Sequence, residues 1–399
     1  MIANNDIIIV GQQPWDIEIG SNCKNIALEF SKSNRVLYVN PPLDRISLLR
    51  DRKDDRIKKR LSIIKGKNAG LVKIQDNLWN LYPDCMIESI NWIKLDAVYD
   101  LLNKINNKRL AASIQKASNT LELKDVILFN DGDMFRSFYM DELLKHQLSV
   151  YYSRDYLLAT DYYKYHGQKL EPLLIRKSSL CVANSTYLAE YCKKYNPHSF
   201  YVGQGCDQLF SANLDPAHVP EDIKNIKGPI IGYVGVLYTS RLDIEILSLI
   251  AKSNSEWQLV LIGPEDKQFI ESELHQLKNV HFLGAKPPEQ LADYINAFDV
   301  CINPQILNEL TIGNYPRKVD EYLSVGKPVV ATKTVAMEVF KEVVSLAGSK
   351  EEYPELIARI LNEETPDKKI KRQAFAATHT WGNSVNEIYK AINIVAQKN

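Results

Sequence analysis

Short, nearly continuous apolar runs recur along the chain, and each ends in small or polar residues. Runs of this kind are typical of strands that are buried on both faces of a sheet. Helix-like stretches such as NIALEFSKS and RLDIEILSLIAKS lie between most of them, so the alternation predicts parallel sheets with right-handed crossovers. The runs occupy residues 6–11, 36–40, 125–130, 148–153, 180–184 and 200–205 in the first half, and 229–235, 258–263, 280–284, 300–304, 328–332 and 343–348 in the second.

Two sets of strands predict two doubly wound, Rossmann-like α/β domains rather than one very wide sheet. Residues 211–229 contain three prolines and little apolar periodicity, which is typical of a linker. We therefore expect a first domain over 1–210, a linker over 211–228 and a second domain over 229–375. A C-terminal helix within 376–399 is expected to cross back onto the first domain. Ligands of such sheets bind at the carboxyl ends of the strands, so the two domains should face a central cleft.

Composition narrows the class of protein. The 399 residues are too many for one core, and 45% hydrophobic with 25% charged residues is ordinary for a soluble globular protein. The 49 basic and 49 acidic residues cancel, which argues against nucleic acid as a partner. No apolar run approaches the roughly 20 residues that span a bilayer. Six cysteines without a CxxC pair predict reduced thiols and a cytoplasmic location, and the histidines show no metal-ligand spacing.

The stretch ELTIGNYPRKVDEYLSVGKPVVAT (309–332) carries the strongest chemical signal. Pro316 is placed to open a helix and Gly326 to close it, and the strand PVVAT follows. The first turn holds Arg317 and Lys318, although positive charge at a helix N-terminus is unfavourable by roughly 0.3–1 kcal/mol. An anion bound between these cations and the free backbone N–H groups explains their placement. Glu321 lies one turn beyond Lys318, where a carboxylate suits a sugar hydroxyl beside that phosphate.

Residues 45–67 differ in kind from the rest of the chain. They hold ten basic and three acidic residues, so the net charge is 10 − 3 = +7, and leucine and isoleucine are interleaved. Such a segment suits an anionic membrane surface, which would place the protein peripherally on the inner face of the plasma membrane. A solvated loop and helix explains the same pattern, and both interpretations stay open.

The order of these parts resembles the GT-B glycosyltransferases, in particular the retaining group 1 (family 4) enzymes that use nucleotide sugars. The resemblance is strong over 229–348 and weaker over 1–210. GYVGVLYTSR (232–241) is similar to the first strand and glycine turn of their donor domain, and LVLIGP to the next strand. VHFLGAKPPEQLADYINAFDVCINP is similar to the segment whose backbone reads the base, and RKVDEYLSVGKPVVAT to the donor helix. VGQGCDQLF (202–210) resembles the segment before the linker.

The resemblance implies that the second domain binds the donor. It places Arg241 and Lys318 at the diphosphate, as catalytic groups that stabilise the leaving phosphate, and Glu321 at the ribose. Relatives often carry a second glutamate eight positions before Glu321, where this chain has Gly313, so either the loop 305–315 is longer or the contact to the transferred sugar comes from backbone. The donor-binding residues implied are Gly235, Arg241, Gly263, Gly284, Lys286, Gly313, Lys318 and Glu321.

On the acceptor side, the first domain offers Gly11, Trp15, Asp131 and Asp155 at strand ends. Asp155 stands where relatives often place an acid or histidine, and it either orients the acceptor as a catalytic group or pairs with a nearby arginine. The sequence Asp131-Gly132-Asp133 resembles a DxD metal motif, but it lies away from the donor helix and DGD is a common turn, so we expect no metal. Tyrosines crowd 151–165, where they pack between domains or stack on sugar rings.

These features predict an enzyme that transfers a sugar from a nucleoside diphosphate sugar to a glycan or a lipid-linked acceptor, with retention, in cell-surface polysaccharide synthesis. It should need no cofactor besides the nucleotide sugar as co-substrate. A nucleotide-sugar epimerase of the same fold and a non-catalytic GT-B partner subunit are the alternatives. A P-loop ATPase is excluded for want of GxxxxGK[ST], and a dehydrogenase for want of GxGxxG after a strand.

Overall fold

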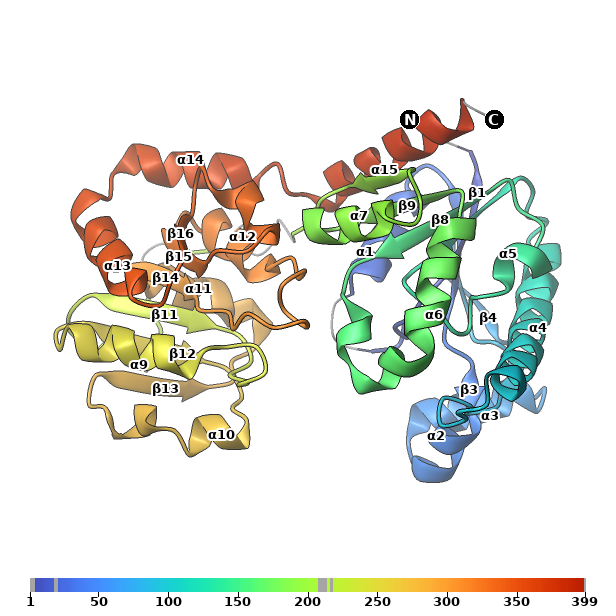
Figure 1. The fold of residues 1–399 in the computed structure, drawn as a ribbon, viewed down its shortest axis with the longest axis horizontal. Coiled ribbons are helices and arrows are strands. Elements are labelled where there is room, and N and C mark those ends of the chain that lie inside the picture. The colour runs from blue at the N-terminus through green and yellow to red at the C-terminus, as the bar shows by residue number, and fades with distance from the viewer. Residues whose placement is uncertain (1–3, 18–20, 207–213, 216–217, 398–399) are drawn as a thin grey trace. The chain divides into compact units, whose positions relative to one another are not determined.

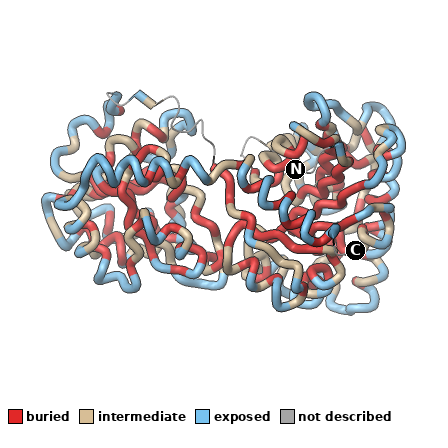
Figure 2. The backbone as a smooth tube through the Cα atoms, turned by 90° about the horizontal axis from the view of Figure 1, so that it is seen from above, coloured by how far each residue is buried: buried red, intermediate tan, exposed pale blue. Residues whose placement is uncertain are grey.

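The computed structural model describes residues 4–17, 21–206, 214–215 and 218–397 (Figure 1). The chain divides into two compact units, one formed by residues 1–203 with 384–399 and the other by residues 204–383. The predicted boundary at 210–211 lies outside the described residues, and the predicted cleft between the domains stays a prediction. In both units the buried residues lie inside and the exposed residues outside (Figure 2).

The first unit is built on an eight-stranded sheet with the order β10-β9-β8-β7-β1-β2-β5-β4, parallel except for β4. The order reverses between β1 and β7, and that switch point is where doubly wound sheets bind ligands. Its strands are β1 (Asp6–Val10), β2 (Arg35–Val39), β4 (Leu71–Gln75), β5 (Leu78–Leu81), β7 (Val126–Asn130), β8 (Leu148–Ser153), β9 (Leu180–Ala183) and β10 (Ser199–Tyr201); β3 (Leu43–Asp44) and β6 (Met86–Ile87) pair separately.

Helices cover both faces of this sheet. One face packs against α4 through Leu110, Ile114 and their neighbours. On the other, Phe30 of α1 lies edge-on to Phe129 of β7 and close to Tyr389 of α15, with ring centroids 5.5 Å apart in each pair. The helices are α1 (Asn22–Ser31), α2 (Arg45–Arg50), α3 (Asp55–Ile64), α4 (Asp96–Thr120), α5 (Met140–Leu143), η1 (Leu157–Ala159), α6 (Asp161–Lys177), α7 (Thr186–Lys193) and α15 (Trp381–Ala396).

The second unit has an all-parallel sheet with the order β13-β12-β11-β14-β15-β16, the order of a Rossmann fold. Its switch point lies between β11 and β14. The strands are β11 (Ile230–Val234), β12 (Gln258–Ile262), β13 (Val280–Gly284), β14 (Val300–Asn303), β15 (Val329–Thr332) and β16 (Ser345–Ala347). Its helices are α9 (Ile244–Ser253), α10 (Lys267–Ile270), η2 (Glu273–Gln276), η3 (Pro288–Gln290), α11 (Leu291–Ala297), α12 (Arg317–Ser324), η4 (Ala336–Phe340), α13 (Glu352–Glu363) and α14 (Pro366–Ala376).

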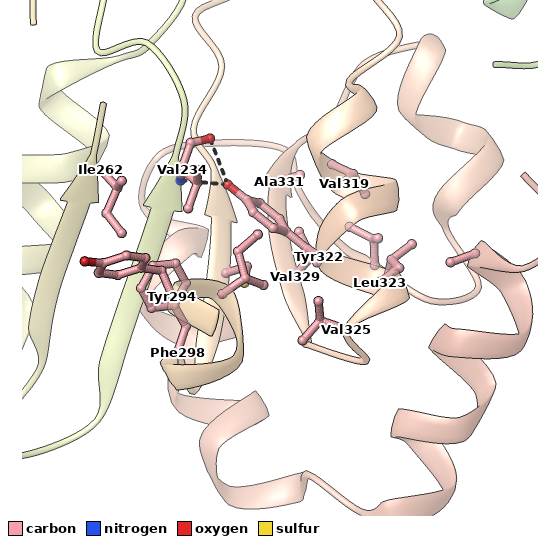
Figure 3. Packing of buried hydrophobic residues seen from close by; sticks show 14 of the residues in the cluster. Val234, Ile262, Tyr294, Phe298, Val319, Tyr322, Leu323, Val325, Val329 and Ala331 are labelled. Atoms are coloured by element: carbon pink, nitrogen blue, oxygen red, sulfur yellow. Dashed lines mark hydrogen bonds between the residues drawn. The ribbon is translucent and has the colours of Figure 1, made fainter. Parts of the chain in front are cut away.

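Helix α12 has the ends that the sequence predicts. Pro316 precedes its first residue, and Gly326, with φ +86°, follows its last turn in the left-handed conformation that glycine tolerates. One face of the helix packs on the sheet, where Tyr322 is fully buried (Figure 3). The Tyr322 hydroxyl accepts from the N–H of Val234 at 2.9 Å, so the start of α12 is tied to the end of β11. The helix therefore begins beside the switch point of the second unit.

The apolar runs predict every parallel strand of the two large sheets except β5, and the structure also adds β4 and the pair β3–β6. Helix α15, predicted from about Trp381 to Ala396, packs within the first unit, where its Tyr389 hydroxyl accepts from Nδ2 of Asn34 at 2.8 Å. Among the described residues, no helix is long and apolar enough to cross a membrane.

Candidate active site

Three glycine turns lie side by side at the carboxyl ends of β11, β12 and β13. Gly235, Gly263 and Gly284 all have positive φ. The N–H of Gly235 donates to Ile262 O (2.8 Å), and the N–H of Gly263 donates to Gly284 O (3.0 Å). A Cβ on Gly263 would lie 1.9 Å from the carbonyl oxygen of Gly235, so only glycine fits there. The turns bring bare backbone to the edge of the sheet, where a phosphate can approach closely.

Lys318 reaches from the first turn of α12 into this edge. Its ammonium donates to the hydroxyl of Tyr233 and lies 4.0 Å from the centroid of that ring. A Cβ on Gly235 would lie 2.6 Å from Lys318 Nζ, so the glycine makes room for the ammonium. Burial lowers the pKa of Lys318 to about 7, while the Glu321 carboxylate raises that pKa and the Arg241 charge lowers it further. A bound anion would stabilise the charged form of this buried lysine.

Arg241 belongs to the same neighbourhood. Its side chain is exposed, and its charge acts on both Lys318 and Tyr233. Its backbone is fixed on both sides, because its N–H donates to Tyr238 O (2.8 Å) and its carbonyl accepts from Ile306 N (3.0 Å). Two cations therefore lie at one end of β11 and, through their mutual repulsion, favour an anionic ligand.

Glu321 and Arg317 form an ion pair on α12, with Arg317 Nε 3.1 Å from Glu321 Oε1. The Glu321 side chain is 16% exposed, and burial raises the pKa of its carboxyl group. Of the two cations in the first turn, Arg317 thus neutralises the glutamate, whereas Lys318 points to the glycine turns. The structure brings Glu321 and Arg241 each within electrostatic range of Lys318.

The loop between β14 and α12 is fastened to the turn that carries Arg241. Asn308 Nδ2 donates to Ser240 O (3.0 Å), and Asn308 Oδ1 accepts from the N–H groups of Leu310 and Thr311. Thr311 is buried, and its carbonyl accepts from Gln305 Nε2 at 2.7 Å. Gly313 is buried in the same loop. Whether its backbone contacts the transferred sugar stays a prediction.

Asp320, Tyr315 and His379 form a hydrogen-bonded cluster that holds α12 in place. The Asp320 carboxylate is fully buried and accepts from the Tyr315 hydroxyl at 2.7 Å, and His379 Nδ1 lies 2.6 Å from its other oxygen. Burial raises the pKa of Asp320, although its hydrogen bond and ion pair with His379 oppose that rise. The cluster fixes the rotation of α12 and so the direction of Lys318.

Lys286 is engaged by its own unit. Its Nζ lies 2.5 Å from Asp222 Oδ2, and Tyr294 donates to the other oxygen of Asp222 at 2.7 Å. The side chain of Lys286 is therefore occupied, and its backbone, with that of Gly284, is left for the predicted contact with the base. Gly284 is exposed, and nothing lies within 4 Å of a Cβ built there.

In the first unit, polar groups meet at the switch point between β1 and β7. Asp131 is fully buried and pairs with Arg154, whose Nε lies 2.9 Å from Asp131 Oδ1. Gln12 joins them: its N–H donates to Asp131 at 3.2 Å, and its side-chain oxygen accepts from Arg154 Nη2 at 3.2 Å. Burial raises the pKa of Asp131, and the charge of Arg154 opposes that rise. Asp131 thus holds Arg154 in place at the edge of the sheet.

The other predicted acceptor-side residues lie around this set. Asp155 pairs with Arg154 Nη1 at 3.1 Å, and its side chain is 42% exposed. Gly11 packs under Tyr38, whose hydroxyl would lie 2.4 Å from a Cβ at that position. Trp15 also packs on Tyr38, edge-on with centroids 5.0 Å apart. Asp155 is therefore the carboxylate of this group that solvent or a ligand can reach.

The Asp131-Gly132-Asp133 turn uses its carboxylates internally. Asp133 Oδ1 accepts from the N–H groups of Phe135 and Arg136, and Asp133 Oδ2 pairs with Arg136 Nε at 2.5 Å. Over the residues that the structure describes, no group of three or more His, Cys, Asp and Glu side chains could hold a metal ion.

Comparison with known proteins finds a family model that matches part of the second unit. The family model described as "Glycosyl transferases group 1" matches residues 228–363, which contain the glycine turns, Arg241, Lys318 and Glu321. Residues 228–363 are therefore similar to a group 1 glycosyl transferase domain. The resemblance stated from the sequence is thereby confirmed for this domain, while the retaining chemistry stays a prediction.

One curated protein to which this chain is similar is the "Putative teichuronic acid biosynthesis glycosyltransferase TuaH" of Bacillus subtilis (strain 168). It is 26% identical over 196 residues, which cover 47% of this chain and 48% of TuaH. The match thus spans about half the length of the curated relative.

Solved structures of glycosyltransferases share the fold over nearly the whole chain. Sucrose-phosphate synthase from Thermosynechococcus elongatus has a TM-score of 0.64 at 12% identity and covers 99% of this chain and 100% of its own. The lipopolysaccharide outer core galactosyltransferase WaaB has a TM-score of 0.63 at 14% identity, with 97% and 99% covered. Anabaena HepE in complex with UDP-glucose has a TM-score of 0.60 at 16% identity, with 98% and 99% covered. The predicted GT-B class of fold is confirmed.

Sequence reasoning missed several residues that shape the group 1 domain. Tyr233 lies inside a buried strand, and nothing in the sequence marks its hydroxyl as the partner of Lys318. Asp320 and His379 are far apart in the sequence, so their pair could not be read from spacing. The role of Asn308 could have been predicted, because a polar loop after a strand often contains an Asx turn.

Proposed function

We propose that this protein is a glycosyltransferase that moves a sugar from a nucleoside diphosphate sugar to a glycan or lipid-linked acceptor, with retention, in cell-surface polysaccharide synthesis. The observation that carries the proposal is the ammonium of Lys318, which lies beside Gly235 at the start of α12 within electrostatic range of Arg241. Bare glycine turns, a helix N-terminus and two cations suit a diphosphate. The family match of this domain supports the choice.

The reaction needs few catalytic side chains. When the bond between the sugar and the diphosphate breaks, negative charge develops on the leaving phosphate, and preorganised cations stabilise that charge. Lys318 and Arg241 serve this role, and loss of either should cost on the order of 10²–10³ in rate, by analogy with lost oxyanion donors. In the retaining mechanism the leaving phosphate takes the acceptor proton, so no enzyme base is needed. Glu321 binds the ribose, and Asp155 orients the acceptor.

Exposed charge in the first unit supports the location that we propose. Nine of the ten cations of residues 45–67 are exposed, whereas Arg60 is buried in an ion pair with Asp16 at 2.9 Å. The positive charge faces solvent and suits an anionic membrane surface. We propose that the protein works in the cytoplasm, peripherally on the inner face of the plasma membrane, and without a metal or other cofactor.

Calorimetric titration with UDP tests the donor site, because the structural neighbour HepE was solved with UDP and with UDP-glucose. Lys318→Met and Arg241→Met should each weaken binding at least tenfold, since a lost charge-assisted contact costs about 1.5–3 kcal/mol. Lys267→Met, which removes an 85% exposed lysine of the same unit, is the matched control. A thermal-shift panel of UDP, GDP, dTDP and CMP sugars then identifies the donor. Unchanged affinity in both variants, with a ligand that binds the wild type, removes the proposed site.

A further inference from the structure

The first unit contains a cavity of about 710 Å³ that the proposed function does not yet use. It is lined by α2, the segment that follows β6, one face of α4, the turn after β7 and the start of α6. All of these belong to the first unit. Its volume falls within the range of roughly 300–1,000 Å³ that is usual for small-molecule sites.

The inner wall of the cavity offers hydrogen-bond donors without partners. Tyr99 is 1% exposed, and its hydroxyl has no hydrogen-bond partner among the residues described. Arg136 gives its Nε to Asp133, and its two Nη groups donate to no described residue. Four acids line the cavity: Asp44, Glu88, Asp133 and Asp161. Asp44 caps α2, Glu88 pairs with two arginines, Asp133 pairs with Arg136, and Asp161 is exposed at the start of α6. The Tyr99 hydroxyl and the two Nη groups of Arg136 remain as donors, and such donors suit an anionic group such as a phosphate monoester.

The mouth of the cavity is apolar and open to solvent. Ile46 is 49% exposed, Trp92 71% and Tyr162 63%, and all three line the cavity. Exposed apolar residues that gather at one opening mark a surface that meets a membrane or another apolar partner. Arg50 of α2 and Lys94 also line the cavity, and both are exposed cations that favour an anionic bilayer. Apolar contact and positive charge at one opening together favour a lipid over a soluble glycan.

The cavity also connects to the edge of the sheet. Tyr163 lines it, and the Tyr163 hydroxyl accepts from Gln12 Nε2 at 2.9 Å. Gln12 in turn contacts Arg154 and Asp131 at the switch point. Two side chains, Tyr163 and Gln12, thus link the lining of the cavity to Asp131 of the acceptor-side residues.

We propose that this cavity binds the head of a membrane lipid that carries a phosphate monoester or a phosphate-linked sugar. The polar end lies against Tyr99 and Arg136, and the hydrocarbon leaves past Ile46, Trp92 and Tyr162 into the bilayer. The inference rests on the proposed function and deepens it: the acceptor is lipid-linked, and it enters the first unit from the membrane.

Photo-crosslinking tests the position of the lipid. The probe is a polyprenyl phosphate with a diazirine in its first isoprene unit, carried in phosphatidylcholine vesicles with the full-length protein. Labels are expected on the segment 86–94 and on the start of α6. Labels that fall only on other parts of the chain overturn the proposal, and so does labelling that an equal amount of phosphatidylglycerol suppresses fully.

Vesicle binding tests the chemistry. The protein should bind vesicles with a polyprenyl phosphate more tightly than vesicles with the same fraction of phosphatidylglycerol. Arg136→Gln should reduce that preference about tenfold and Tyr99→Phe about threefold, as expected for a charged and a neutral hydrogen bond. Trp92→Ser should weaken binding to both vesicle types, and Ile370→Ser, at a 62% exposed site in the second unit, is the matched control.

The outcomes separate this inference from the proposed function. If Arg136→Gln and Tyr99→Phe leave the preference unchanged while they stay folded by circular dichroism, the lipid site is wrong. If these variants instead weaken a soluble oligosaccharide acceptor without vesicles, the cavity binds a glycan and the lipid proposal is overturned. UDP titration of the same variants should match the wild type, because the donor residues lie in the other unit. Failure of the wild type to bind any nucleotide sugar contradicts the proposed function alone.

Discussion

Binding of a nucleoside diphosphate should draw a proton onto Lys318. In the free protein, burial lowers the pKa of this lysine to about 7, so above that pH most molecules carry a neutral amine. A diphosphate beside the amine restores the ammonium and raises its pKa toward the ordinary value of about 10.4. The complex therefore holds more protons than the free protein between these two values, and affinity must fall as pH rises through this window.

The magnitude follows from the pKa. At pH 7 about half of the free protein has a neutral Lys318, and at pH 8 about nine-tenths, so binding should take up about 0.5 and 0.9 protons respectively. Between pH 7 and pH 8.5 the dissociation constant for UDP should rise about 15-fold, or about 1.6 kcal/mol. The terminal phosphate of the ligand ionises near pH 6, below this range, so it adds little.

Titration calorimetry in buffers of different ionisation enthalpy measures this uptake directly, because the observed heat changes linearly with the buffer enthalpy. Lys318→Arg keeps a permanent charge and should show no uptake, whatever its affinity. Lys318→Met should also raise the melting temperature of the free protein below pH 7, since it removes a desolvated ammonium. Wild-type UDP binding without proton uptake at pH 8 would refute the assignment of Lys318 to the diphosphate.

Three further outcomes are expected. Asp320→Ala leaves His379 without its buried partner and should lower the free energy of unfolding by about 3–5 kcal/mol in urea denaturation, whereas Asp367→Ala at an exposed helix start should cost under about 1 kcal/mol. Gly263→Ala should abolish UDP binding in calorimetry because its Cβ meets backbone at 1.9 Å, but Gly284→Ala, with open space around it, should retain binding at a stability cost of about 1–2 kcal/mol. Transferase activity should survive EDTA, since Asp131 is already paired with Arg154, and a loss that manganese reverses would contradict this.

The sequence predicted the parallel sheets well for a physical reason. Strands that are buried on both faces consist almost entirely of apolar residues, and the segments DIIIV and QLVLI have this composition. The hairpin β4–β5 escaped notice because β4 is an edge strand with mostly exposed residues, and β5 carries a buried asparagine, Asn80. Neither strand shows the apolar run that marks the others.

The candidate site was predictable where backbone chemistry dictates residue type. Glycines at Gly235 and Gly263 and cations in the first turn of α12 are costly unless a ligand needs them, so they stand out. The partners that aim these groups were not predictable, because a tyrosine in a strand such as Tyr233 looks like ordinary core. Likewise, the sequence alone gives Asp320 the appearance of an exposed helix residue, because its partner His379 is far away in the sequence.

Helix α15 has a consequence for how the protein is made. It completes the first unit by packing on Phe30 and hydrogen bonding to Asn34, yet the residues that make these contacts are translated after the whole second unit. The second unit is one continuous stretch and can fold as soon as it leaves the ribosome, whereas the first unit must wait with Phe30 uncovered until α15 has been made. A nascent chain arrested before Trp381 should therefore recruit chaperones through its oldest segment rather than its newest one.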